Sequence, residues 1–180
     1  MNSETLVNNL NPDVAKMSSG IQLKGWNGKN EGGIFRQTGS ADKSHMLFTV
    51  NTTNDVAMVI NENRNVGIGI TAPTSKLEVN GAATNTVALN AAAATTIDFA
   101  LSNLAYTSAT ANTITLSNLK DGGAYSLVFT STAVNTAVTF SATGFTFKYM
   151  GTGVRTTGKA HIYSFIVAGT VVYVSMSTEN

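Results

Sequence analysis

Side chains that could carry chemistry are few in this 180-residue chain. Its two histidines, His45 and His161, lie far apart in the sequence, and there is no cysteine. The missing thiols exclude a disulfide, a cysteine nucleophile and a cysteine-based zinc site. Two isolated histidines form no ligand set, so we expect both on strand faces or exposed, and we expect no metal site.

The ten acidic residues offer no catalytic pair. Asp98 alternates with Ile97 and Phe99, so its side chain is expected to face outward from a strand. Glycosidases need two facing acids, and α/β-hydrolases need a Gly-x-Ser-x-Gly elbow, which is absent. Most other acids fall in turns or near the chain ends: Asp42, Asp55, Glu62, Asp121 and Glu179. We therefore predict no catalytic residue and no enzyme.

Binding of nucleotides, nucleic acids or membranes is also disfavoured. Gly67-Ile68-Gly69 lacks the third glycine and the following helix of a dinucleotide loop, and residues 151–153 fail the same test. Charged residues make up 12% with a net charge of +1, and no basic run is present to neutralise phosphates. The start of the chain lacks the pattern of a secretory signal, and no apolar run is long enough to span a membrane. We expect no cofactor.

Exposed aromatic rings are the remaining candidates for ligand contact. Trp26 lies in a Gly-rich turn, and Tyr106 and Tyr149 lie near the ends of expected strands. Such rings can stack on sugars, but packing is their commoner role, so none is assigned to a site.

The chain divides into three parts on composition. Residues 1–20 are polar and irregular; one or two helical turns over Ser3–Leu10 would end at Asn11-Pro12. This segment is either a flexible tail or a peptide that orders on a partner. Residues 21–83 and 84–180 both show the period-two alternation of β-strands.

The middle part, residues 21–83, holds too few large apolar side chains to fold alone. Strands are expected at 46–50, 56–60, 66–70 and 77–79, with a polar turn at 61–65. Three copies wound together would bury a common set of side chains, with glycines allowing close backbone approach. That set is Val66, Ile68, Ile70, Leu77 and Val79.

The third part, residues 84–180, has enough aromatic and branched residues for a core of its own. Ala91–Ala94 is interpreted as loop or strand, and residues 168–170 as a tight hairpin turn. Strands are expected at 97–101, 113–116, 125–129, 138–140, 145–149, 160–167 and 171–176. Their number and spacing predict a β-sandwich or jelly roll, and hence an all-β chain.

Residues 66–81, VGIGITAPTSKLEVNG, are the most specific motif. They resemble the VGIGTTxPxxKLxVxG element of bacteriophage tail fibres and spikes, and residues 46–65 resemble that family's lead-in. The sequence departs at Ile70-Thr71-Ala72 but keeps the glycine spacing and the proline. In the family the element is a structural joint of an intertwined homotrimer. The implied joint residues are Val66, Gly67, Ile68, Gly69, Ile70, Pro73, Leu77, Val79 and Gly81.

Residues 97–177 also look like a second recurrent virion module. The cues are Ile97-Asp98-Phe99, the turn at 115–123, and the late apolar strands. The resemblance implies a trimeric β shaft over 21–83, an outward head over 84–180, and attachment of residues 1–20 to a virion protein. It also implies assembly in the bacterial host cytoplasm. The head would contact the host surface, with glycan as the expected ligand.

Two other interpretations stay open. The chain could be a capsid head fibre or decoration protein without a receptor role, which its short length favours. It could also be a free carbohydrate-binding module, although such a module would not need the joint at residues 66–81. Trimeric fibres can hold an axial metal, but usually through a His-x-His pair that is missing here.

Overall fold

A computed structural model describes residues 17–24, 30–38, 44–50, 55–130, 136–151 and 153–180. Every regular element within these ranges is a β-strand, which confirms the all-β prediction. The expected helical turns at Ser3–Leu10, most of the expected anchor segment, and Trp26 lie outside the described residues. Contacts divide the chain into two units, Met1–Ala83 and Thr84–Asn180.

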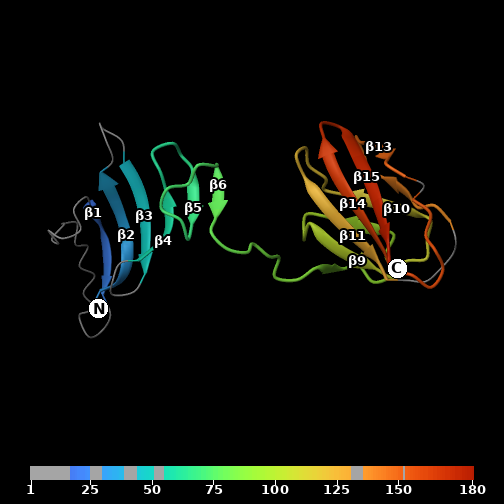
Figure 1. The fold of residues 1–180 in the computed structure, drawn as a ribbon, viewed down its shortest axis with the longest axis horizontal. Helices are drawn as coiled ribbons and strands as arrows, with labels where there is room; N and C mark the ends of the chain where they lie inside the picture. The colour runs from blue at the N-terminus through green and yellow to red at the C-terminus, as the bar shows by residue number, and fades with distance from the viewer. Residues whose placement is uncertain (1–16, 25–29, 39–43, 51–54, 131–135, 152) are drawn as a thin grey trace. The chain divides into compact units, whose positions relative to one another are not determined.

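The first unit is one six-stranded sheet whose strand order follows the sequence (Figure 1). Neighbouring strands pair antiparallel except β5 and β6, which pair in parallel. The four expected strands are found, and β1 and β2 are additional. The strands are β1 (Met17–Lys24), β2 (Asn30–Thr38), β3 (Ser44–Val50), β4 (Asp55–Ile60), β5 (Val66–Ile68) and β6 (Leu77–Val79).

The second unit contains a six-stranded and a three-stranded sheet. The chain alternates between them: β7, β9 and β11 pair in parallel in one sheet, and β8, β10 and β12 pair in parallel in the other. The strands are β7 (Leu89–Asn90), β8 (Thr96–Asp98), β9 (Leu104–Thr107), β10 (Thr113–Ser117), β11 (Ala124–Phe129), β12 (Thr139–Ser141), β13 (Thr146–Tyr149), β14 (His161–Ala168) and β15 (Val171–Thr178).

This winding is solenoid-like and differs from the antiparallel pairing of a jelly roll. Up to β12, each return to a sheet adds a parallel strand beside the last one, because the intervening strand lies in the other sheet; β13 returns to the larger sheet at its far edge, where it pairs in parallel with β15. The antiparallel hairpin β14–β15 then completes the larger sheet. Its two-residue turn contains Gly169 at φ +61, as the hairpin signal predicts. Strands β7 and β9 were not expected from the sequence.

The core of the second unit lies between its two sheets. Phe140 on β12 packs against Phe165 and Tyr163 on β14, with ring centroids 4.8 and 5.0 Å apart. Buried aliphatic residues from both sheets, such as Ile114 and Leu127, complete the cluster. This unit therefore buries its own apolar side chains, as residues 84–180 were expected to do.

Candidate assembly site

One face of the first unit's sheet carries an uninterrupted apolar row. The cross-strand register places one residue of each strand in line: Ile21, Ile34, Phe48, Met58, Ile68 and Val79. Ile21 is 51% exposed and Ile68 is 45% exposed, although both are large aliphatic side chains. We call this line of six side chains the apolar row.

A second line of side chains runs beside the apolar row on the same face. It consists of Arg36, Met46, Ile60, Val66 and Leu77, of which Leu77 is 62% exposed. Arg36 is the one charged residue in these two lines. Its Nε donates a hydrogen bond to Ser44 Oγ at 2.8 Å, at the margin of the face. The two lines together form the apolar face of the first unit.

Few apolar side chains of the first unit are buried within a single chain. Among its described residues, Leu47 and Val59 are the fully buried aliphatic side chains, and both lie on the opposite side of the sheet. A contiguous exposed apolar area of this extent is typical of an interaction surface. In a single chain, the described part of this unit thus leaves most of its large apolar side chains outside a core.

The residues expected to form the trimer joint are divided by the structure. Val66, Ile68, Leu77 and Val79 lie together on the apolar face. Ile70 lies apart from them on the other side of the sheet, where its Cγ2 would meet a Cβ at Gly67 at 3.1 Å. The side chain of Ile70 thus packs near Gly67 of its own chain, away from the apolar face.

The remaining joint residues shape the crossover from β5 to the parallel strand β6. Gly69 and Gly81 have φ angles of +68° and +143°, which L side chains rarely adopt. Pro73 is buried, and its carbonyl oxygen accepts hydrogen bonds from Asn61 Nδ2 at 3.0 Å and Asn65 Nδ2 at 3.1 Å. These residues shape the crossover loop, and they are not part of the apolar face.

Asn61 organises this crossover more than any residue that the motif suggested. Its Oδ1 accepts from the backbone N–H groups of Asn63 and Asn65, each at 3.0 Å, while its Nδ2 holds Pro73. From the sequence, residues 61–65 were expected only to form a polar turn. The signal was the repeated asparagine, a residue that commonly bonds to nearby backbone groups.

Glu78 fastens the other end of the crossover. Its carboxylate accepts from Thr74 N at 2.7 Å and from Thr74 Oγ1 at 3.0 Å, and these bonds lower the pKa of Glu78. The carboxylate is solvent-exposed and is used within the loop. It is therefore a structural group and not a candidate acid catalyst.

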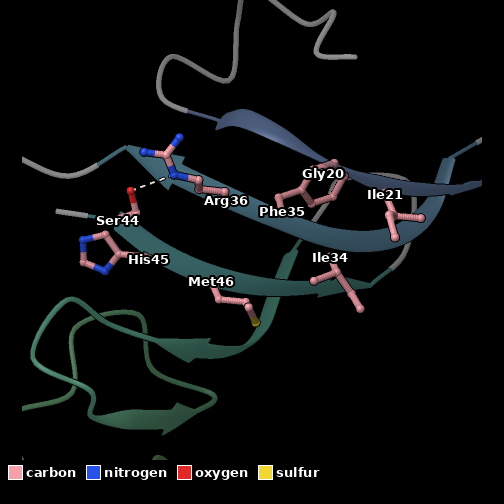
Figure 2. Close-up of a pocket in the computed structure, with 8 residues that line it drawn as sticks. All are labelled: Gly20, Ile21, Ile34, Phe35, Arg36, Ser44, His45 and Met46. Atoms are coloured by element: carbon pink, nitrogen blue, oxygen red, sulfur yellow. Dashed lines mark hydrogen bonds between the residues drawn. The ribbon is translucent and has the colours of Figure 1, made fainter. Parts of the chain in front are cut away.

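A hollow of about 460 Å³ lies at the β1–β3 end of the apolar face (Figure 2). Isoleucines 21 and 34 and Met46 contribute its apolar wall, and the Arg36–Ser44 hydrogen bond closes one end. Ser44 and His45 are consecutive on β3, so their side chains leave opposite faces of the sheet. They therefore cannot act as a nucleophile and its base, and the hollow adjoins the apolar face.

The second unit buries a polar group between loop and sheet. Arg155 is 1% exposed and donates to the carbonyl oxygens of Ala109, Thr110 and Ala111 and to Asn112 Oδ1. Its guanidinium carbon lies 4.7 Å from the centre of the Phe129 ring. The guanidinium therefore satisfies loop carbonyls in the interior instead of binding a carboxylate.

His161 and Tyr163 on β14 belong to the same buried group. His161 Nε2 accepts from Thr156 N at 2.8 Å, and burial, followed by the Arg155 cation, lowers the pKa of His161. Tyr163 donates to the carbonyl oxygen of Gly153 at 2.6 Å, and burial raises the pKa of Tyr163 to about 12. His161 is thus a buried strand residue whose contacts hold the 153–156 segment.

Other sequence candidates do not gather into a site. Asp98 is half-buried; its Oδ1 accepts from Ala100 N and Asn118 Nδ2, and these bonds lower the pKa of Asp98. Within the described ranges, no three His, Asp or Glu side chains are grouped as a metal site would require. The same ranges contain no helix with the length and apolarity of a membrane span.

No protein-family model matches the chain, and a search of the curated proteins finds no match.

Proposed function

We propose that this chain is a structural subunit of a bacteriophage fibre or spike that assembles as a homotrimer through the apolar face. The observation that carries the proposal is the apolar row across all six strands of the first unit. The resemblance of residues 66–81 to the phage fibre joint supplies the biological context.

The energetics favour assembly over a solitary first unit. Fully burying one large aliphatic or aromatic side chain contributes about 1.5–3 kcal/mol. Several such side chains on the apolar face are at least two-fifths exposed, including Ile21, Ile34 and Met46. Covering them between copies offers a gain of several times that amount, before the entropy cost of association is deducted.

Residues 21–83 are the shaft in this proposal, and residues 84–180 are the head. Residues 1–20 attach the subunit to another virion protein through the stretch that precedes β1, because Met17–Gly20 already pair with β2. The head faces outward toward the host surface, where weak contacts with glycan gain strength from three copies. The subunit has no catalytic role, no cofactor and no metal.

Two alternatives make different demands on the chain. A capsid decoration protein without a receptor role would keep the trimer but show no host binding. A free carbohydrate-binding module would need only the second unit, which has its own core. The apolar face of the first unit favours the assembling protein over the free module.

Sedimentation of the full chain tests the assembly. We expect a trimer, and we expect Ile68→Lys to dissociate it because the lysine introduces an unpaired charge into the covered face. Thr115→Lys is the matched control, since Thr115 is exposed on β10 of the second unit. A well-folded monomeric wild-type chain at micromolar concentration would contradict the proposal.

Placement on the particle needs a separate test. Deleting residues 1–17 should leave the trimer intact but remove the protein from purified particles. Normal occupancy of the truncated protein would place the anchor elsewhere. Binding of labelled trimer to host cells then separates the outward contact role from the decoration role.

A further inference from the structure

The two outer faces of the second unit differ sharply in chemistry. The outer face of the three-stranded sheet carries only hydroxyl and carboxyl side chains on its strands. They are Thr96, Asp98, Thr113, Thr115, Ser117, Thr139 and Ser141. Hydroxyl and carboxyl side chains of this kind are typical of a sheet face that contacts solvent. This face is the reference for the outer face of the other sheet.

The outer face of the six-stranded sheet is apolar by comparison. In register across β11, β14 and β15 stand Ala124, Ile166 and Tyr173, and Ile166 is 60% exposed. A second line joins Tyr106, Val128 and Ile162 across β9, β11 and β14. Exposed aliphatic residues in this density mark an interaction surface.

Serine side chains fill the space between these two apolar lines. Ser126, Ser164 and Ser175 are aligned in register across β11, β14 and β15, and Leu104 on β9 closes this line at one end. Lines of the same face are separated by two residues along a strand, which is about 7 Å. The small serines therefore form a trough flanked by two apolar ridges.

We infer that this ridged face packs against a second copy of the chain. In a three-fold assembly each copy meets its two neighbours through two different parts of its surface, so a ridge such as Ile162 or Ile166 of one copy fits the serine trough of the next copy. This inference rests on the proposed assembly and extends it from the first unit to the second.

The charge pattern favours a copy of the same chain as the occupant. A face with an excess of one charge would repel the same face of another copy, whereas a nearly neutral face meets no such repulsion. Among the outward residues described on this sheet's strands, Lys148 on β13 is the charged one, and β13 is an edge strand. The centre of the face consists of aliphatic, tyrosine and serine side chains.

The extent of the face is also sufficient. Six strands spaced about 4.8 Å apart and up to eight residues long cover on the order of 600 Å² in projection. A stable protein interface buries about 800 Å² on each partner, which is the same order. Tyr106 and Tyr173 could also stack on a sugar, but most side chains of the two ridges are aliphatic, and a protein surface of the same kind covers them better.

Single-cysteine labelling of the full chain tests this inference, because the natural sequence has no cysteine. Ser175→Cys places a thiol in the trough, and Thr115→Cys places one on the hydroxyl face; both positions are exposed in the single chain. In the assembled protein, maleimide should modify Ser175→Cys at least about tenfold more slowly than Thr115→Cys. Adding Ile166→Lys to Ser175→Cys should abolish the protection, whereas adding Thr139→Lys should not.

Each other outcome overturns the inference in a distinct way. Equal labelling in a trimeric chain removes this contact but leaves the proposed assembly through the first unit. Equal labelling in a monomeric chain removes both. If the cysteine at position 175 is protected from maleimide in a monomeric chain, another part of the same chain covers the face. If it is protected only after a host glycan is added, the face binds sugar.

Discussion

Ile70 lies directly over Gly67 on the side of the sheet opposite the apolar face. A Cβ at Gly67 would lie 2.6 Å from the carbonyl oxygen of Ile70 and 3.0 Å from Val59 Cγ1. The crossover between β5 and β6 therefore reaches the sheet only because residue 67 has no side chain. The contact lies within one chain, so it bears on the fold of each subunit.

Gly67→Ala should lower the free energy of unfolding by about 1–3 kcal/mol, because the added methyl group overpacks a backbone contact. Denaturant unfolding of the full chain measures this change. Gly151→Ala is the control, since nothing lies within 4 Å of its Cβ position. Equal stability of the two variants would show that the crossover shifts freely.

Gly69→Val should also destabilise the chain, but for a different reason from close packing. Gly69 has φ +68°, and a Cβ there would lie 3.2 Å from Asn80 O. A β-branched residue in this backbone region costs about 1–3 kcal/mol in strain. Gly69→Asn should lose clearly less, because asparagine tolerates positive φ. Equal thermal melting of both variants would argue against strain as the cause.

Asn61→Ala should cost about 1–3 kcal/mol, because it leaves the buried amide of Asn65 without its acceptor and removes one donor to Pro73. Asn61→Asp replaces the donor to Pro73 by an oxygen, but its charge strengthens the two bonds from the backbone N–H groups. We expect its loss to be the smaller one at neutral pH. The same unfolding measurement ranks the variants, and the reverse order would contradict the assigned bonds.

Acid should weaken the second unit as the pH falls below about 6.5, the ordinary pKa of histidine. The pKa of His161 is lowered from 6.5 by burial and by Arg155, while the Lys159 backbone and Glu179 oppose the shift. The folded state therefore disfavours the proton that the unfolded chain accepts. Stability is full above about pH 6.5 and declines as the pH falls from there toward the lowered pKa of the folded state.

Calorimetric unfolding of the wild type and His161→Gln over this pH range checks the sign. Glutamine offers an acceptor for Thr156 N but does not titrate, so the variant should show a flatter pH profile. Glu78 and Asp98 have pKa values lowered from 4.5 and 3.8, so their contributions are lost only in more acidic solution. Parallel profiles for both proteins would remove His161 as the source.

The amino-acid pattern alone was enough to predict the all-β class and most strands of the chain. In β14, buried His161, Tyr163 and Phe165 alternate with outward residues, and this period of two is visible in the sequence. Strands β7 and β9 were missed, because Leu89-Asn90 and residues 104–107 are too short to show a clear alternation.

Which residues share a face depended on the tertiary structure. Val66, Ile68 and Ile70 alternate with glycine and were expected on one side, but β5 ends at Ile68 and the positive φ of Gly69 turns Ile70 to the other side. The apolar row depends on pairing register between strands up to 58 positions apart, from Ile21 to Val79. The alternation within one strand cannot fix this row, because the row needs the correct register in each of the five successive strand pairs. The interior place of Arg155 likewise arises where residues 109–112 and β11 meet.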